Sequence, residues 1–191
     1  MPDEPEAEGL LALLILTESR RAARTSADGE LIPLPVRDRT RWDAALIAEG
    51  HALVRECLRR NHPGPYQIQA AIQAVHTDAR TAAATDWPQI LALYDQLAAL
   101  TPNPMVLLNR AVALAEVSGP ATALAELVTL PLEDHHLFHA IRADLLRRLG
   151  REAEAAAAYE RAIALTTNGP EREFLRARAE SLGESSLGRG R

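Results

Sequence analysis

Hydrophobic residues along this chain recur mostly at intervals of three or four, which is the spacing of one face of an α-helix. The clearest stretch runs from Asp86 to Pro120 and holds two such sets: Ile90, Leu93, Tyr94, Leu97 and Leu100, then Leu107, Leu108, Ala111, Leu114 and Ala115. Asp86 is the expected N-cap of the first helix, and Asn103 that of the second. Helices joined by so short a connection pack antiparallel, so the stretch predicts a helical hairpin.

A second hairpin is predicted between His136 and Thr167. Gly150 stands where a tight turn is needed, and the small Ala155 stands where the two helices are expected to cross. Tyr94 and Tyr159 are separated by nearly two periods of the tetratricopeptide repeat, which is about 34 residues long. We therefore predict an all-α fold, a right-handed array of tetratricopeptide-like helical hairpins.

Two extra helices are expected before this array. The first is predicted over Leu10–Arg24, with Leu10, Leu13, Leu14 and Thr17 on one side and a run of arginines at its C-terminal end. The second is predicted from Thr40 to Arg60, with Thr40 as N-cap and Asp43 in a capping box. Between them, residues 25–39 are irregular, and Pro33 and Pro35 limit this segment to an edge strand or a docked loop.

One continuous domain is expected, with four sections. Residues 1–8 are interpreted as a linker remnant, and residues 9–65 as the N-terminal helices with their loop. Residues 66–182 form the repeats, ending in a helix over residues 171–182 that covers the last repeat. Residues 183–191 are expected to be disordered.

Composition restricts the class of function. Of the 191 residues, 47% are hydrophobic and 25% charged, which is typical of a folded globular protein. The net charge of -5 argues against direct binding of nucleic acid, because neutralising phosphates needs a basic face. The apolar run Gly9–Thr17 is too short to span a bilayer, so no membrane association is expected. With one cysteine and no secretory signal, a cytoplasmic location is predicted.

No catalytic constellation is found, and we expect neither an enzyme nor a cofactor. The densest group of metal-ligand types is His135, His136 and His139 beside Glu133 and Asp134. His135 and His139 are four residues apart and so share a helix face, which makes them weak metal candidates. Because Cys57 lies on an apolar helix face, we interpret it as a packing residue.

Better candidates are polar residues on the first helix of each hairpin, which lines the concave side of a tetratricopeptide array. Aligning the turns at Gly119 and Gly150 selects the polar residues Asn109, Glu116, Asp144 and Arg147. Arg110 is added because it interrupts an apolar helix, and Gln69, Gln73 and His76 of the first unit are expected to extend the same surface. Two interpretations stay open for them. They either make internal hydrogen bonds or lie at a solvated edge, or they recognise the backbone or a carboxylate of a partner segment.

Trp42 and Trp87, at the starts of two helices, are interpreted as packing anchors. The charged cluster from Asp38 to Asp43 is interpreted as a salt-bridged junction that fixes the preceding loop.

Several segments, taken in order, resemble one group of extracytoplasmic-function sigma factors: GLLALLIL, RRAAR, ADGEL, RDRTRWDAALIAEG, GPYQIQAAIQAVH, TDWPQILALYD, LTPNPMVLLNRAVALAE and HAIRADLLRRLGR. The resemblance runs from Pro2 to Leu182 and concerns the helical, SnoaL-lacking extension that follows the two core regions of these factors. The loop departs from the pattern, since it reads IPLPVRD where an acidic stretch is usual.

The resemblance implies a regulatory domain without the sigma core regions. In that family the extension acts on the sigma factor from within, in place of a separate anti-sigma protein. The implied partners are the sigma core regions or RNA polymerase. Two alternatives stay open: a free-standing tetratricopeptide-like module for another peptide, and a metal or small-molecule sensor built on the histidines. The oligomeric state is not predicted.

Overall fold

The computed structural model describes the backbone of residues 4–188 and the side chains of residues 4–182. Over these residues the chain consists of α-helices, short 3-10 helices and connecting segments, with no β-strand. This confirms the prediction of an all-α fold. Within the described part, no helix combines the length and the apolar character needed to cross a bilayer.

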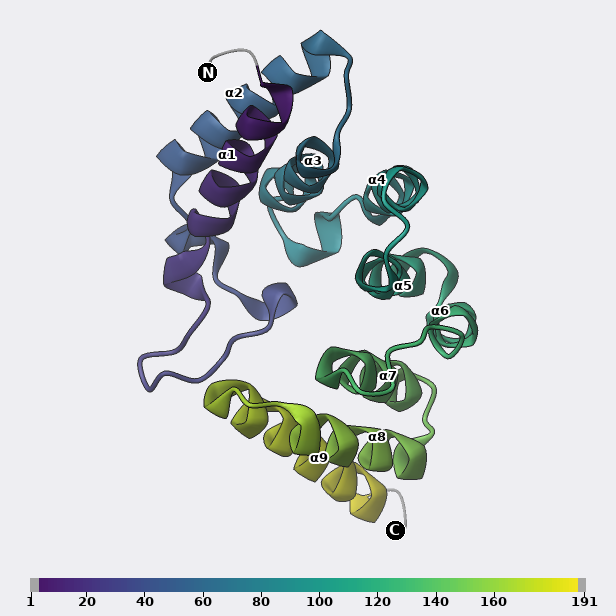
Figure 1. Cartoon of the computed structure of the whole chain (residues 1–191). Coiled ribbons are helices and arrows are strands. Elements are labelled where there is room, and N and C mark those ends of the chain that lie inside the picture. The colour runs from purple at the N-terminus through teal and green to yellow at the C-terminus, as the bar shows by residue number, and fades with distance from the viewer. Residues whose placement is uncertain (1–3, 189–191) are drawn as a thin grey trace. The chain divides into compact units, whose positions relative to one another are not determined.

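Figure 1 labels the α-helices along the chain. They belong to two compact units. Unit 1 comprises Met1–Asp28 and Ile32–Val106, and unit 2 comprises Gly29–Leu31 and Leu107–Arg191. The α-helices are α1 (Pro5–Glu18), α2 (Ala44–Arg60), α3 (Pro65–Asp78), α4 (Trp87–Leu100), α5 (Pro104–Ser118), α6 (Pro120–Leu127), α7 (His136–Arg148), α8 (Glu152–Leu165) and α9 (Gly169–Gly188). In unit 1, α1 packs against both α2 and α3, and α3 packs against α4.

Helix α1 starts at Pro5, so the interpretation of residues 1–8 as a linker remnant is wrong for residues 5–8. The Glu6 carboxylate explains why this turn is ordered. It accepts hydrogen bonds from the backbone N–H of Tyr66 (3.0 Å) and the side chain of Gln67 (3.1 Å) in the first turn of α3. Since the N-cap of α3 is Gly64, which has no side chain to offer, Glu6 supplies the missing acceptor.

The buried face of α1 is not the predicted one. Gly9, Ala12 and Leu16 face the core, whereas Leu10 and Leu14 are 36% and 58% exposed. The helix is apolar on all sides, so hydrophobic spacing does not distinguish its faces. Small residues at positions 9 and 12 allow the backbones of neighbouring helices to come close, and this determines the orientation of α1.

The segment between α1 and α2 is a docked loop, one of the two forms that the sequence allowed. It contains three 3-10 turns, η1 (Arg21–Ala23), η2 (Leu34–Val36) and η3 (Arg39–Arg41). Helix α2 starts later than predicted, because Asp43 is itself the N-cap and accepts from the N–H groups of Ala45 (2.9 Å) and Leu46 (3.0 Å). At the other end of α2, Asn61 adopts the left-handed conformation with φ of 52°.

The helices α4 and α5 begin at their predicted caps. The Asp86 side chain accepts from the N–H of Gln89 (2.9 Å), and the Asn103 side chain accepts from that of Met105 (2.8 Å). Ile90 and Leu97 of α4 are buried as predicted, but Leu100 is 51% exposed because it lies in the last turn of the helix.

In unit 2, α6 packs against α7, α7 against α8, and α8 against α9. Gly119 and Gly150 occupy the predicted turns with φ of 87° and 71°, values that favour glycine. The inner face of the α7–α8 hairpin is confirmed, since Ala155, Tyr159 and Ala162 are all buried. Helix α9 continues to Gly188, past its predicted end at residue 182, and the predicted disorder of residues 183–188 stays a prediction, while residues 189–191 lie outside the described residues.

Candidate functional site

The three predicted groove residues of unit 1 all belong to α3 and all take part in internal contacts. Gln69 donates to the carbonyl of Pro65 (3.2 Å), and Gln73 accepts a hydrogen bond from the Arg20 guanidinium. His76 is buried, with 8% of its surface exposed, and its ring packs edge-on against Trp87 at 5.4 Å. An exposed position for His76, which the groove hypothesis assumed, is therefore not observed.

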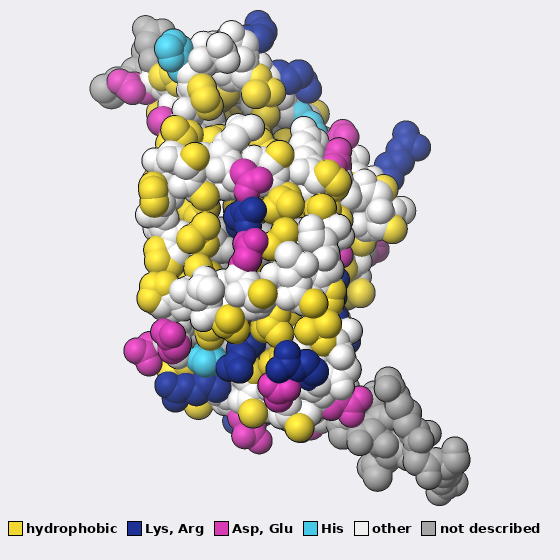
Figure 2. Space-filling model, turned by 90° about the vertical axis from the view of Figure 1, so that its right-hand side faces the viewer, with side chains coloured by type: hydrophobic (Ala, Val, Ile, Leu, Met, Phe, Trp, Pro, Cys, Tyr) yellow, Lys and Arg dark blue, Asp and Glu magenta, His cyan; other side chains and the backbone are white. Residues whose placement is uncertain are grey.

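The five predicted residues of unit 2 are mostly paired within that unit. Ion pairs join Arg110 to Glu126, Glu116 to Arg148 (2.7 Å) and Asp144 to Arg147 (2.7 Å). Asn109 is exposed. On the face in Figure 2, acidic and basic side chains likewise lie beside one another among hydrophobic ones. These pairs agree with the internal interpretation of the residues, and partner binding by them stays a prediction.

The histidines near the start of α7 have structural roles. His135 is the N-cap of α7, and its Nδ1 accepts from the N–H of Leu137 (3.2 Å). His136 contacts the Glu171 carboxylate at 3.2 Å. His139 is buried and bonds through Nε2 to the carbonyl of Glu133 (2.7 Å). In the part of the chain that the structure describes, no three His, Cys, Asp or Glu side chains gather as metal ligands.

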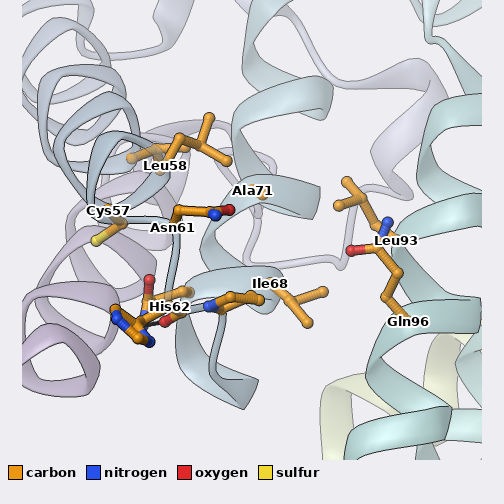
Figure 3. Close-up of a pocket in the computed structure, with 11 residues that line it drawn as sticks. Cys57, Leu58, Asn61, His62, Ile68, Ala71, Leu93 and Gln96 are labelled. Carbon is orange, nitrogen blue, oxygen red and sulfur yellow. Dashed lines mark hydrogen bonds between the residues drawn. The ribbon is translucent and has the colours of Figure 1, made fainter.

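An apolar groove of about 180 Å³ opens on unit 1 above α3. Figure 3 shows Ile68 and Ala71 of α3 between Leu58 and Asn61 on one side and Leu93 of α4 on the other. His62, Pro63, Gln67 and Gln96 add a partly polar margin. Leu58 is 68% exposed and lies at the edge of this groove. The groove is suited to one or two apolar side chains of a partner, framed by amide groups.

Cys57 borders this groove but is only 4% exposed, and its thiol lies 4.0 Å from the carbonyl of Pro5. Burial raises the pKa of the Cys57 thiol, and the nearby Glu8 raises it further. The thiol is therefore held in its unreactive protonated form, in agreement with its interpretation as a packing residue.

Unit 1 also contains a cluster of arginines around Trp42. The guanidinium groups of Arg20 and Arg39 lie over the Trp42 ring, 5.9 and 4.5 Å from its centroid. Arg39 also donates to the carbonyls of His76 (2.7 Å) and Ala79 (2.6 Å) at the C-terminal end of α3. Trp42 is thus a packing anchor, as predicted, and Arg39 connects the loop to α3.

Arg24 and Arg37 complete the group that we call the arginine cluster: Arg20, Arg24, Arg37 and Arg39. Arg24 donates to the carbonyl of Thr17 (3.2 Å) in the last turn of α1, and Arg37 donates through Nε to that of Ile32 (2.8 Å). Burial lowers the pKa of Arg20 to about 10, and repulsion from Arg37, Arg24 and Arg39 contributes.

The interpretation of residues 38–43 as a salt-bridged junction is wrong in its chemistry. Asp38 accepts from the backbone N–H and the hydroxyl of Thr40, and Asp43 caps α2. Neither carboxylate forms an ion pair with Arg39, which bonds to backbone carbonyls instead. The sequence analysis singled out residues 38–43 and the arginines at the end of the first helix. It did not predict that Arg20 and Arg39 lie close together, because only the fold brings these two residues near each other.

The buried His76 gives a testable pH dependence. Burial lowers its pKa from 6.5 to about 4, with further contributions from Arg20 and Arg39. Between these values the unfolded chain binds a proton that the folded chain does not, so stability is complete above pH 6.5 and falls as the pH drops toward 4. The loss is expected to reach about 3 kcal/mol, at about 1.4 kcal/mol per pH unit.

Urea unfolding followed by tryptophan fluorescence, at several pH values, measures this effect, because both Trp42 and Trp87 belong to unit 1. His76→Gln is expected to flatten the pH dependence, whereas His62→Gln, at an exposed position, keeps it. Equal slopes for the two variants would show that His76 does not control it.

Comparison with known proteins relates the chain to a longer protein. A family of unknown function, DUF6596, matches residues 1–58. An uncharacterized protein of Rhizobium meliloti (strain 1021) is 44% identical over 183 residues, which cover 95% of this chain and 43% of that protein. The chain therefore spans less than half the length of this curated relative. No solved structure matches the chain.

Proposed function

We propose that this chain is a regulatory protein-interaction domain of an extracytoplasmic-function-type sigma factor, and that it modulates transcription initiation by docking the sigma core or RNA polymerase. The observation that carries the proposal is the ordered run of sigma-extension motifs, which extends from Pro2 to Leu182. The match to part of a much longer relative supports the proposal, since more than half of that protein lies outside the match and has room for sigma core regions. No catalytic role is included.

The groove above α3 supports a docking mode. Its apolar floor and its amide-bearing margin fit the hydrophobic face of a helix from the sigma core. Burying one leucine-sized side chain there contributes about 1.5–3 kcal/mol, enough to matter in a contact made within one polypeptide.

Binding of the purified chain to a sigma core and to RNA polymerase, both from the same organism, tests the proposal. Leu58→Glu places a charge at the groove and is expected to weaken binding at least tenfold. Val128→Glu is the matched control, because Val128 is 51% exposed in unit 2, and it should bind as the unchanged chain does. A chain that binds neither the sigma core nor the polymerase contradicts the proposal.

A free-standing tetratricopeptide-like module is the second candidate. It is favoured by the α7–α8 hairpin with its small crossing residue and glycine turn, which match the repeat pattern without reference to sigma factors. Under this alternative the Leu58→Glu variant would lose a peptide partner unrelated to transcription while the sigma core never binds. The third candidate, a metal or small-molecule sensor built on the histidines, is less favoured, because His135, His136 and His139 contact other groups of the chain.

A further inference from the structure

The arginine cluster has no carboxylate partner among the described residues. Nearby acids are engaged elsewhere, since Glu18 pairs with Arg21 (3.1 Å), Asp38 bonds to Thr40 and Asp43 caps α2. Burial and the charges of Arg37, Arg24 and Arg39 lower the pKa of Arg20, and burial and the charge of Arg24 lower the pKa of Arg37. Such an arrangement costs free energy, because like charges repel and buried cations lose hydration.

Backbone carbonyls offset only part of this charge. Arg24 bonds to the C-terminal end of α1, and Arg39 bonds to that of α3. A helix C-terminus carries about half a negative charge, so the two ends together offset about one of the four positive charges. The ring of Trp42 adds a weaker attraction for Arg20 and Arg39. Most of the positive charge is therefore unopposed.

Arg20 shows the imbalance most clearly. Only 5% of the Arg20 surface is exposed, and its Nε is a buried donor without an acceptor among the described residues. The indole Nε1 of Trp42 is a second buried donor without an acceptor, and it lies in the same neighbourhood. Buried polar atoms normally have a partner, so these two donors call for an acceptor that none of the described residues supplies.

We propose that the arginine cluster is an oxyanion-binding site that receives a carboxylate from an acidic segment of a partner polypeptide. The planar guanidinium group bonds to carboxylates in a two-point geometry, which suits this ligand. Under the proposed function the docked partner is a polypeptide, so we take the anion to be a side-chain carboxylate and not a nucleic-acid phosphate. This inference rests on the proposed function, since it names the chemistry of the segment that docks.

The two tryptophans report directly on the site, because Trp42 lies under Arg20 and Arg39 and Trp87 packs on His76. Titrating the full chain with a capped decaglutamate peptide at low salt is expected to change tryptophan emission in a saturable way. A capped decaglutamine peptide should cause no change. Raising the salt concentration should weaken the decaglutamate response, because screening reduces charge–charge attraction.

Arg37→Gln tests the cluster with the least damage to the fold, since Arg37 bonds only to the carbonyl of Ile32. It is expected to lower the affinity for decaglutamate about tenfold. Arg59→Gln removes the same charge from an exposed position in α2 and should leave the affinity unchanged. If Arg37→Gln fails to fold, Arg24→Gln takes its place. The comparison of decaglutamate with decaglutamine on the unchanged chain tests carboxylate binding independently of either variant.

Four outcomes overturn the inference: no saturable response to decaglutamate, equal affinity in Arg37→Gln and Arg59→Gln, tighter binding of a ten-nucleotide oligothymidylate, or equally tight binding of inorganic phosphate. The last two outcomes would show that the cluster binds nucleic-acid phosphate or a free anion.

The proposed function is tested by a different measurement, the binding of the sigma core and of RNA polymerase. If decaglutamate binds as expected while the sigma core and polymerase do not, the site stands and its partner is a different acidic protein.

Discussion

Replacing Leu16 by alanine is expected to lower the free energy of unfolding of unit 1 by about 2–5 kcal/mol. Leu16 is fully buried in a cluster with Ala12, Val54 and Ala70, where α1 meets α2 and α3. Removing its branched end leaves a cavity that the tightly packed small neighbours cannot fill by moving inward. Urea unfolding followed by tryptophan fluorescence measures the change.

Leu14→Ala is the matched control, because it is the same substitution in the same helix at a position that is 58% exposed. Its effect is expected to stay within about 0.5 kcal/mol. A larger loss for Leu14 than for Leu16 would show that α1 is oriented with its leucine face inward, as the hydrophobic spacing alone predicted.

The second large effect is expected for Gly9→Ala, which should destabilise unit 1 by about 1–3 kcal/mol. An added Cβ at Gly9 would lie 2.7 Å from the backbone nitrogen of Gln67 and 3.0 Å from its Cα. Because these are backbone atoms, α1 and α3 must separate to make room. The clash outweighs the helix preference of alanine over glycine, which is about 1 kcal/mol.

Gly169→Ala provides the control, since an added Cβ there has no atom within 4 Å. It should leave stability unchanged or raise it slightly. Thermal unfolding of both variants, followed by circular dichroism, distinguishes the cases. A stability gain at Gly9 would mean that α1 and α3 are farther apart than the structure shows.

Local chemistry made most helices predictable. Asp86 and Asn103 cap their helices where the sequence placed them, and Gly119 and Gly150 form the predicted turns. Each of these signals involves residues only a few positions apart, so it acts before any tertiary contact forms. The predicted helix ends were wrong where two neighbouring residues could each act as the cap. Thr40 was predicted as the N-cap of α2, but Asp43 is the N-cap in the structure.

The candidate sites were less predictable. The groove above α3 is lined by residues from α2, α3 and α4, and no spacing in the sequence links Leu58 to Leu93. The polar residues selected from the repeat pattern are mostly engaged in internal pairs such as Asp144 with Arg147. Their pairing depends on which side chains a neighbouring turn or helix brings within reach, and repeat alignment does not contain that information.

The amino-acid order was sufficient to establish an all-α chain with its turns and many of its helix ends, because hydrogen bonding within a helix and at its caps is local. The tertiary structure decided the buried face of α1, the capping of α3 by Glu6 and the meeting of Arg20 with Arg39. These features depend on contacts between residues distant in the chain. Their free energies arise only when helices pack, since burial and charge–charge proximity do not exist in an isolated segment.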